Sequence, residues 1–224
     1  MTHSNHRRGT RESLVGDWVV FTSGGEGTVA TSTKLFKIYS KYDPVAMSQG
    51  RGRGARWMSH WTPKRNSGTL EVATPEEIRN RPRVLPASGF HGGSAVFDNK
   101  EAVEGVLREL NEADLGFSVV VSGVFDELTS MAKRAGLKNA PHTINMSAET
   151  FGKTELLAEP HVLEFTTMCG HDYVAANLVK HLLGRVKDGK MSSESAAVEM
   201  AKQCTCNFVN VARAIKLIDA YVEG

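Results

Sequence analysis

The sequence predicts an α/β fold, a partly parallel sheet flanked by helices, with a basic β-containing N-terminal portion and a helical C-terminus. Two observations predict this class. Between residues 94 and 167, short β-rich runs alternate with helical segments long enough to connect parallel strands. After residue 172, apolar residues repeat at helical spacing. We therefore divide the chain into a flexible N-terminal arm, a basic β-containing portion with a long loop, and an α/β portion: 1–14, 15–93 and 94–224.

The basic portion is expected to hold strands and one long loop. Residues 18–21 form a short apolar run, and the Gly-rich stretch 23–27 that follows predicts a hairpin turn. Residues 35–39 continue the β pattern. From 43 to 68 the chain loses its periodicity and is rich in Gly, Pro, Arg and Ser. A loop of this length is typical of a functional or partner-bound segment.

The α/β portion is expected to alternate strands with helices. One helix starts after Asp98 with Glu101 as its capping-box partner, and the next ends at Gly136. Alternation of this kind implies parallel pairing of the strands. No internal repeat is apparent. The expected strands are 94–97, 117–121, 142–146 and 162–167, and the expected C-terminal helices are 173–183, 193–202 and 207–222.

The composition excludes several classes of protein. With 224 residues, 41% hydrophobic and 23% charged, the chain is expected to be an ordinary soluble globular protein. Its longest apolar runs, such as 119–121, fall far short of the roughly 20 residues that a bilayer span requires. The polar start lacks the apolar stretch of a secretory signal. We therefore expect a cytoplasmic protein without a membrane partner, in which thiols stay reduced.

Charge is distributed unevenly along the chain. The formal net charge is +2, but residues 1–100 hold 15 Lys and Arg against 8 Asp and Glu, whereas residues 101–224 hold 12 against 17. A basic first half favours an anionic ligand or the acidic surface of a neighbouring copy or partner subunit.

Part of the positive charge lies in the segment 48–65. It contains Arg51 and Arg53, with Trp57 and Trp61 nearby. Arginine binds carboxylates and phosphates bidentately, and tryptophan stacks on flat ligands. A small anionic substrate fits this pattern. Nucleic acid is disfavoured because the segment is short and the remainder of the chain is acidic.

The three cysteines are the most informative residues. Cys169 follows the strand expected at 162–167 and precedes a helix, and Cys204 and Cys206 precede the last helix. Helix N-termini lower thiol pKa values and favour anionic ligands. If both sites converge at the carboxyl end of a parallel strand, three thiolates meet where open α/β sheets place their ligands.

Four interpretations of these cysteines remain open. Three thiolates would hold a [4Fe–4S] cluster and leave one iron free as a Lewis acid. Adding His171 would give a closed tetrahedral Cys3His zinc site. Without metal, Cys169 would be a nucleophile activated by His171, with Cys204 and Cys206 as a redox pair. Buried cysteines also serve packing alone, but the polar residues beside these three favour a ligand role.

Further site residues follow from the expected fold. His171 is the nearest proton donor to the cysteines, and His91 lies on a Gly-rich segment that could reach a ligand. Ser122, Asn145 and Ser147 would line the same edge of a parallel sheet and hydrogen-bond a substrate. The sequence therefore predicts an iron–sulfur enzyme of the lyase, hydratase or oxidoreductase type. A zinc-stabilised binding or subunit protein, contacting a partner or RNA through its basic loop, and a metal-free thiol enzyme are the alternatives.

Overall fold

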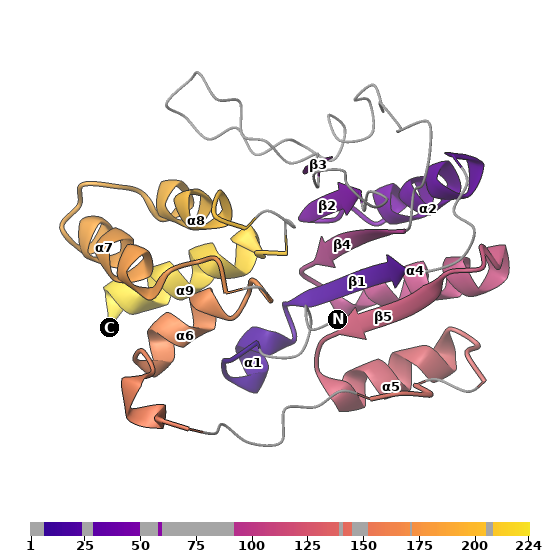
Figure 1. The fold of residues 1–224 in the computed structure, drawn as a ribbon, viewed down its shortest axis with the longest axis horizontal. Helices are drawn as coiled ribbons and strands as arrows, with labels where there is room; N and C mark the ends of the chain where they lie inside the picture. The colour runs from indigo at the N-terminus through magenta and orange to yellow at the C-terminus, as the bar shows by residue number, and fades with distance from the viewer. Residues whose placement is uncertain are drawn as a thin grey trace.

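The computed structural model describes residues 7–23, 29–49, 58–59, 92–138, 141–144, 152–170, 172–204 and 208–224. The described chain has two parts, a sheet with helices and a helical bundle, and α1 lies between them (Figure 1). The elements are α1 Arg11–Leu14, β1 Trp18–Ser23, α2 Val29–Lys41, β2 Ala46–Gln49, β3 Met58–Ser59, β4 Gly93–Phe97, α4 Lys100–Ala113, β5 Ser118–Ser122, α5 Phe125–Arg134, a 3-10 turn Thr154–Leu156, α6 Pro160–Thr166, α7 Ala176–Lys187, α8 Ser193–Ala201 and α9 Val211–Glu223.

The sheet has the order β3-β2-β4-β1-β5, and every neighbouring pair is antiparallel. Trp18 pairs with Phe97 across β1 and β4, and Val20 pairs with Val121 across β1 and β5. β1 and β2 are joined through α2 but both pair with β4, which lies between them. β4 and β5 are likewise joined through α4 with β1 between them. This is the split β-α-β arrangement of ferredoxin-like folds.

The expected partly parallel sheet is therefore wrong. Strands joined by one helix do run parallel to each other, as the alternation implied, but each such pair is separated by an inserted antiparallel strand. Local periodicity reports the type of an element and carries no information about which strands become neighbours. The edge at which Cys169 and strand-end residues were expected to meet does not exist in this topology.

Two expected strands are helices. Residues 35–39 belong to α2, in which Leu35, Phe36 and Tyr39 are buried on one face. Residues 162–166 belong to α6, which has Pro160 in its first turn and buries Val162, Phe165 and Thr166. Both sets follow the i, i+3, i+4 spacing of a helix. Apolar runs this short fit a strand equally well, so their type depends on the packing partner.

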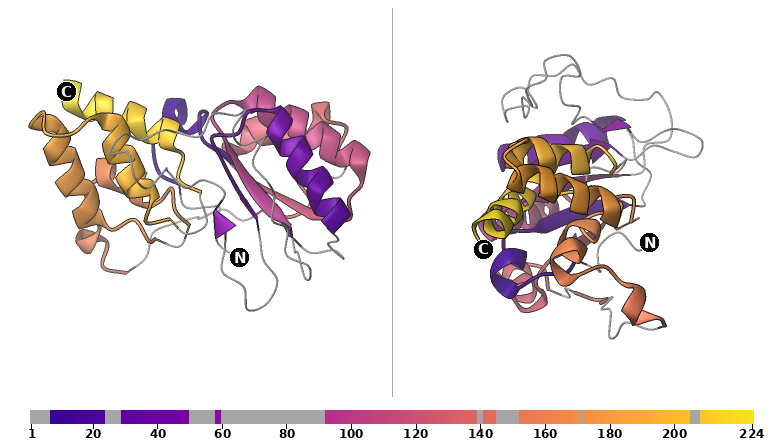
Figure 2. Two further views of the ribbon diagram at one scale, coloured as in Figure 1. Left: turned by 90° about the horizontal axis from the view of Figure 1, so that it is seen from above. Right: turned by 90° about the vertical axis from the view of Figure 1, so that its left-hand side faces the viewer.

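The buried residues of both parts form one continuous core. On one face of the sheet, Tyr39 of α2 packs edge-on against Phe97 of β4, with ring centroids 6.4 Å apart. Phe36 of α2 packs edge-on against Tyr39, with ring centroids 6.1 Å apart. On the other face, Phe21 of β1 meets Phe208 of the bundle, with ring centroids 6.4 Å apart. The sheet therefore lies between its own helices and the bundle, as Figure 2 shows. In the part of the chain that the structure describes, no helix has the length and apolar character needed to cross a membrane.

Candidate metal-binding turns

Both described cysteines lie in loops of the helical bundle. We call residues 167–175, between α6 and α7, the first cysteine turn, and residues 202–210, between α8 and α9, the second cysteine turn. Cys169 and Cys204 are not joined in a disulfide, and 2% and 3% of their surface is exposed. Each follows the end of a helix, and Cys169 does not follow a strand. Each also lies six residues before the cap of the next helix, so the expected position at a helix N-terminus is wrong.

The two turns repeat one helix–turn–helix spacing, and we call each repeat a copy of the unit. α6 ends at Thr166 and α8 at Ala201, and α7 begins at Ala176 and α9 at Val211, so each boundary recurs after 35 residues. The same displacement carries Cys169 onto Cys204. The sequences Cys-Gly-His-Asp-Tyr-Val and Cys-Thr-Cys-Asn-Phe-Val then align. The repeat is not apparent in the sequence because few of the aligned residues are identical. The ends of the helices in the structure show how the two segments align.

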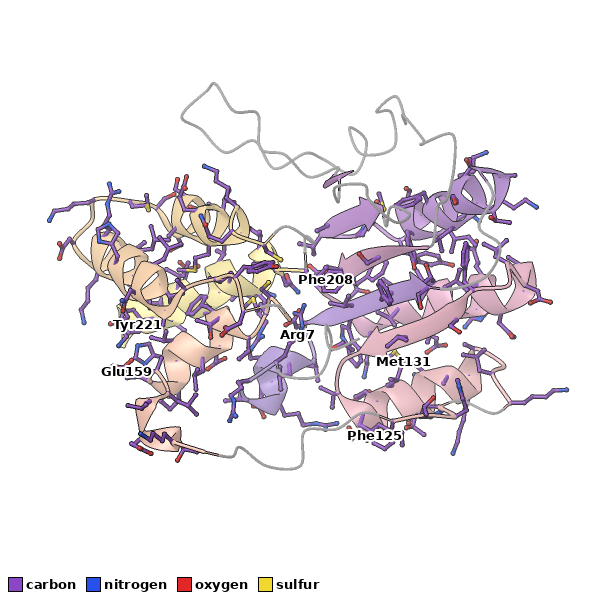
Figure 3. All side chains as sticks on the ribbon, viewed as in Figure 1. Arg7, Phe125, Met131, Glu159, Phe208 and Tyr221 are labelled. Carbon is purple, nitrogen blue, oxygen red and sulfur yellow. The ribbon has the colours of Figure 1, made fainter. Side chains whose placement is uncertain are left out.

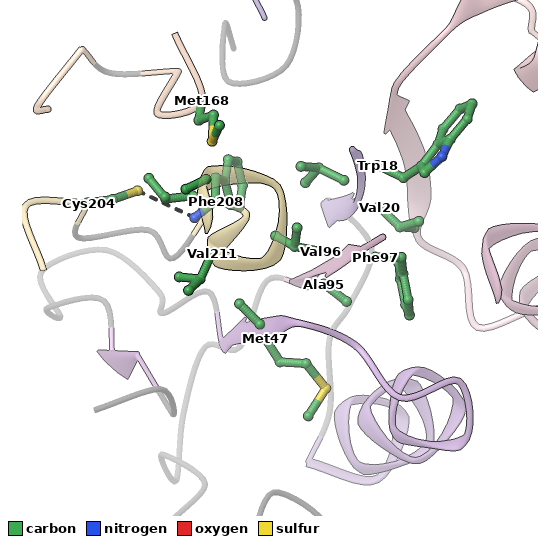
Figure 4. Close-up of a cluster of buried hydrophobic side chains, with 14 of the residues drawn as sticks. Trp18, Val20, Met47, Ala95, Val96, Phe97, Met168, Cys204, Phe208 and Val211 are labelled. Atoms are coloured by element: carbon green, nitrogen blue, oxygen red, sulfur yellow. Dashed lines mark hydrogen bonds between the residues drawn. The ribbon is translucent and has the colours of Figure 1, made fainter. Parts of the chain in front are cut away.

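The second cysteine turn holds its sulfur with a backbone donor. The N–H of Phe208 donates to Sγ of Cys204 over 3.4 Å, and the Cys204 N–H donates to the carbonyl of Ala201. Phe208 is buried against Cys204, and in Figure 4 the labelled Met168 and Cys204 both lie beside Phe208. Because Met168 precedes Cys169, the two turns approach the same region of the core. An N–H donor favours a thiolate and tunes a sulfur that ligates metal.

The first cysteine turn is closed by a backbone bond of its own. The Asp172 N–H donates to the carbonyl of Cys169 over 3.0 Å, and Asp172 has φ +57°, in the left-handed region. Burial, and secondarily the Cys169 thiol, raise the pKa of the Asp172 carboxyl. The Cys169 thiol therefore lies close enough to influence the Asp172 carboxyl.

A buried ion network joins the second turn to the sheet. Asp17, just before β1, accepts from Arg213 of α9 over 2.9 Å and from Arg7, and all three side chains are at most 5% exposed. Asn210 donates to Asp17 and to the carbonyl of Gly16. A second carboxylate, Glu164 of α6, accepts from Arg213 over 3.2 Å. Arg213 of α9 thereby contacts α6 through Glu164 and the segment before β1 through Asp17.

The N-terminal residues reach both turns. The Arg7 guanidinium donates to the carbonyl of Phe208 over 2.6 Å, and Figure 3 places Arg7 and Phe208 together where the bundle meets the sheet. The Arg8 N–H donates to Oγ1 of Thr167 over 3.0 Å. Residues 7–8 thus contact the first turn and the second turn at once.

The remaining predicted site residues are only partly covered. Ser122 is buried at the end of β5, opposite Val19, in an antiparallel edge strand. Among the described residues, no group of three His, Cys, Asp or Glu is arranged to hold a metal ion. Outside the described residues lie His171, Cys206, Arg51, Arg53, His91, Asn145 and Ser147.

Sequence reasoning missed the residues of the ion network. Asp17 precedes an apolar strand, and Arg213 lies among the apolar residues of the last helix. A charged residue among the apolar residues of a helix could have indicated the ion network, because a buried charged group requires a buried partner. The acidic partner cannot be chosen from the sequence, since Asp17 is separated from Arg213 by almost the whole chain.

Comparisons with protein-family models, with curated proteins and with solved structures find no match for this chain.

Proposed function

We propose that the helical bundle carries a [4Fe–4S] cluster ligated by Cys169, Cys204 and Cys206. The observation that supports this proposal is the repetition of one helix–turn–helix unit, which presents a buried cysteine at the same point of each copy. Packing alone needs no such correspondence between two turns. The N–H donor to Cys204 is the kind of contact that stabilises sulfur ligands.

Three cysteine ligands leave one iron open to a substrate. A small anionic substrate would bind there, with Arg51 or Arg53 neutralising its charge and His171 acting as the proton donor. Chemistry of the lyase or hydratase type follows from such polarisation, and a reductive step would require an external electron donor. Ser122, His91, Asn145 and Ser147 are the remaining candidates for substrate contacts. A cytoplasmic location fits this proposal, because reduced thiols persist there.

A zinc site is the second candidate, and the repeat favours it specifically. The displacement of 35 residues aligns His171 with Cys206, so each copy of the unit contributes a pair of ligand residues, Cys-x-His and Cys-x-Cys. Two such pairs form a Cys3His set, which suits closed tetrahedral zinc. The protein would then be a metal-stabilised subunit or binding protein that contacts its partner through the basic loop.

Anaerobic purification followed by absorption spectroscopy and analysis of iron, sulfide and zinc separates these functions. The cluster predicts a brown protein with about four iron and four sulfide per chain. Stoichiometric zinc in a colourless protein supports the second candidate. A colourless chain without metal contradicts both and leaves the metal-free thiol enzyme or simple packing.

Single substitutions test the ligand set. We expect Cys169→Ala, Cys204→Ala and Cys206→Ala each to abolish the chromophore, whereas Met168→Leu, which changes a buried neighbour of Cys169, keeps it. A cysteine whose removal leaves the iron content intact is not a ligand.

A further inference from the structure

We infer that residues 7–9 form a strap that closes over both cysteine turns and controls access to the buried thiols of Cys169 and Cys204. The juxtaposition rests on contacts of described residues and holds whether or not the thiols bind metal. A reagent or metal ion that reaches either sulfur from this side must first displace the strap.

The strap is attached to the second turn through Arg7. Its guanidinium donates both to the Phe208 carbonyl and to the Asp17 carboxylate, and the side chain is 5% exposed. Phe208 is the same residue whose N–H donates to Cys204. Phe208 therefore bonds to Arg7 through its carbonyl and to the Cys204 sulfur through its N–H, which belong to successive peptide groups.

The strap is attached to the first turn through the backbone of Arg8. Its N–H donates to Oγ1 of Thr167, which in turn donates to the carbonyl of Leu163 over 2.6 Å. Its carbonyl accepts from Nη2 of Arg213 over 2.6 Å. One residue is thus held from both sides, by the first turn and by the helix that follows the second.

Gly9 allows the chain to pass closely over this joint. Its φ is +146°, and a Cβ placed there would lie against Nη2 of Arg213 and 2.8 Å from Oε2 of Glu164. Flexible side-chain ends usually give way, but Arg213 is fixed by its buried bond to Asp17. Any residue with a Cβ at position 9 must therefore lift the strap or break the ion network.

The test measures the alkylation rate of each cysteine, resolved by peptide mass spectrometry, in the full-length protein with N-ethylmaleimide. Gly9→Ala is expected to accelerate modification of both Cys169 and Cys204 by about tenfold, since protection tracks the population of the open state. Gly189→Ala is the matched control, because Gly189 also has a positive φ, +68°, but no atom within 4 Å of an added Cβ. Equal rates in the two variants overturn the inference.

Two milder variants separate the attachments and serve if Gly9→Ala does not fold. Arg7→Gln is expected to accelerate Cys204 more than Cys169, and Thr167→Val, which removes the acceptor of the Arg8 N–H, to accelerate Cys169 more than Cys204. Arg11→Gln, which breaks exposed pairs with Asp126 and Glu127, should change neither rate. General destabilisation would raise both rates together, so loss of this selectivity in folded variants contradicts the strap.

Metal analysis of the same samples keeps this inference distinct from the iron–sulfur proposal. A wild-type chain without metal, but with strap-dependent alkylation rates, contradicts the cluster and supports the strap. If the chain holds the cluster, but alkylation rates and metal loss are the same in Gly9→Ala and Gly189→Ala, the result supports the cluster and contradicts the strap.

Discussion

The two cysteine turns share their spacing but differ in their surroundings. Tyr173 of the first turn is 53% exposed, whereas its counterpart Phe208 in the second turn is 2% exposed and packs against Phe21 of the sheet. The second copy of the unit is therefore buried in the joint between the bundle and the sheet, and the first copy lies nearer the solvent. The second cysteine turn therefore attaches the bundle to the sheet, whereas Tyr173 of the first turn is exposed to solvent.

At two further pairs of corresponding positions, the two copies have different residues. Ala175, before α7, provides no side-chain cap, whereas Asn210, before α9, accepts from the Arg213 N–H and donates to Asp17 and Gly16. Leu178 in the first copy corresponds to Arg213 in the second. The polar residues that tie the bundle to the sheet are present in only one copy.

The largest expected effect comes from Arg213→Leu, which gives the second copy the residue of the first. This change leaves the buried Asp17 carboxylate with one fewer cation and removes the donors to Ser13, Arg8 and Glu164. Breaking a buried charge pair from one side costs about 3–5 kcal/mol. Urea denaturation should therefore show a loss of this size in the free energy of unfolding.

Lys216→Leu on the same helix is the control, since Lys216 is exposed and its replacement should change stability by less than about 0.5 kcal/mol. If Arg213→Leu is no worse than this control, the ion network does not join the two parts.

The sequence allowed several elements to be predicted but not their pairing. The helices expected at 193–202 and 207–222 correspond to α8 and α9, and in α9 the apolar residues keep a helical period. The runs at 35–39 and 162–167 were too short to distinguish the two periods. Strand order depends on contacts far apart in the chain, so antiparallel insertion of β4 between β1 and β2 could not be read from periodicity.

The candidate site was predicted by residue type and misplaced by fold. The cysteines stood out because polar residues surround them, but the expected meeting point at a parallel sheet edge depended on a strand that is the helix α6. The backbone bond from Asp172 to Cys169 and the Arg7 attachment depend on backbone geometry and on residues at opposite ends of the chain. Neither could be deduced from local pattern.

A smaller effect is expected from exchanging the caps of α7 and α9. Asn210→Ala removes the cap of α9 and two bonds to the sheet, and should cost about 2 kcal/mol. Ala175→Asn adds a side chain where φ −67° and ψ 136° already suit a cap, and should stabilise by up to about 1 kcal/mol. Thermal unfolding of both variants checks the pair. If both variants lose the same stability, the two turns do not differ in the capping of the helix that follows them.

The smallest expected effect concerns the exposed ion pair between Glu159, just before α6, and Lys180 of α7. Glu159, before α6, accepts from Lys180 of α7, which holds the pKa of Glu159 below its ordinary value of 4.5. Its counterpart Glu194 also has a lowered pKa, but through its own backbone N–H and Ser192, and Lys180 corresponds to Ile215. Only the first copy therefore uses this exposed ion pair between its two helices.

A lowered carboxyl pKa stabilises the folded state above the ordinary value, and this contribution is lost as the pH falls through the lowered value. Lys180→Met should thus be slightly less stable than wild type at pH 7, and the difference should diminish at an acidic pH below the lowered pKa of Glu159. Chemical denaturation at both pH values checks this, with Lys216→Met as the control, because no carboxylate among the described residues forms an ion pair with Lys216. A difference that persists at the acidic pH would assign the effect to lost packing of the lysine stem and remove the ion pair from the comparison between the two copies.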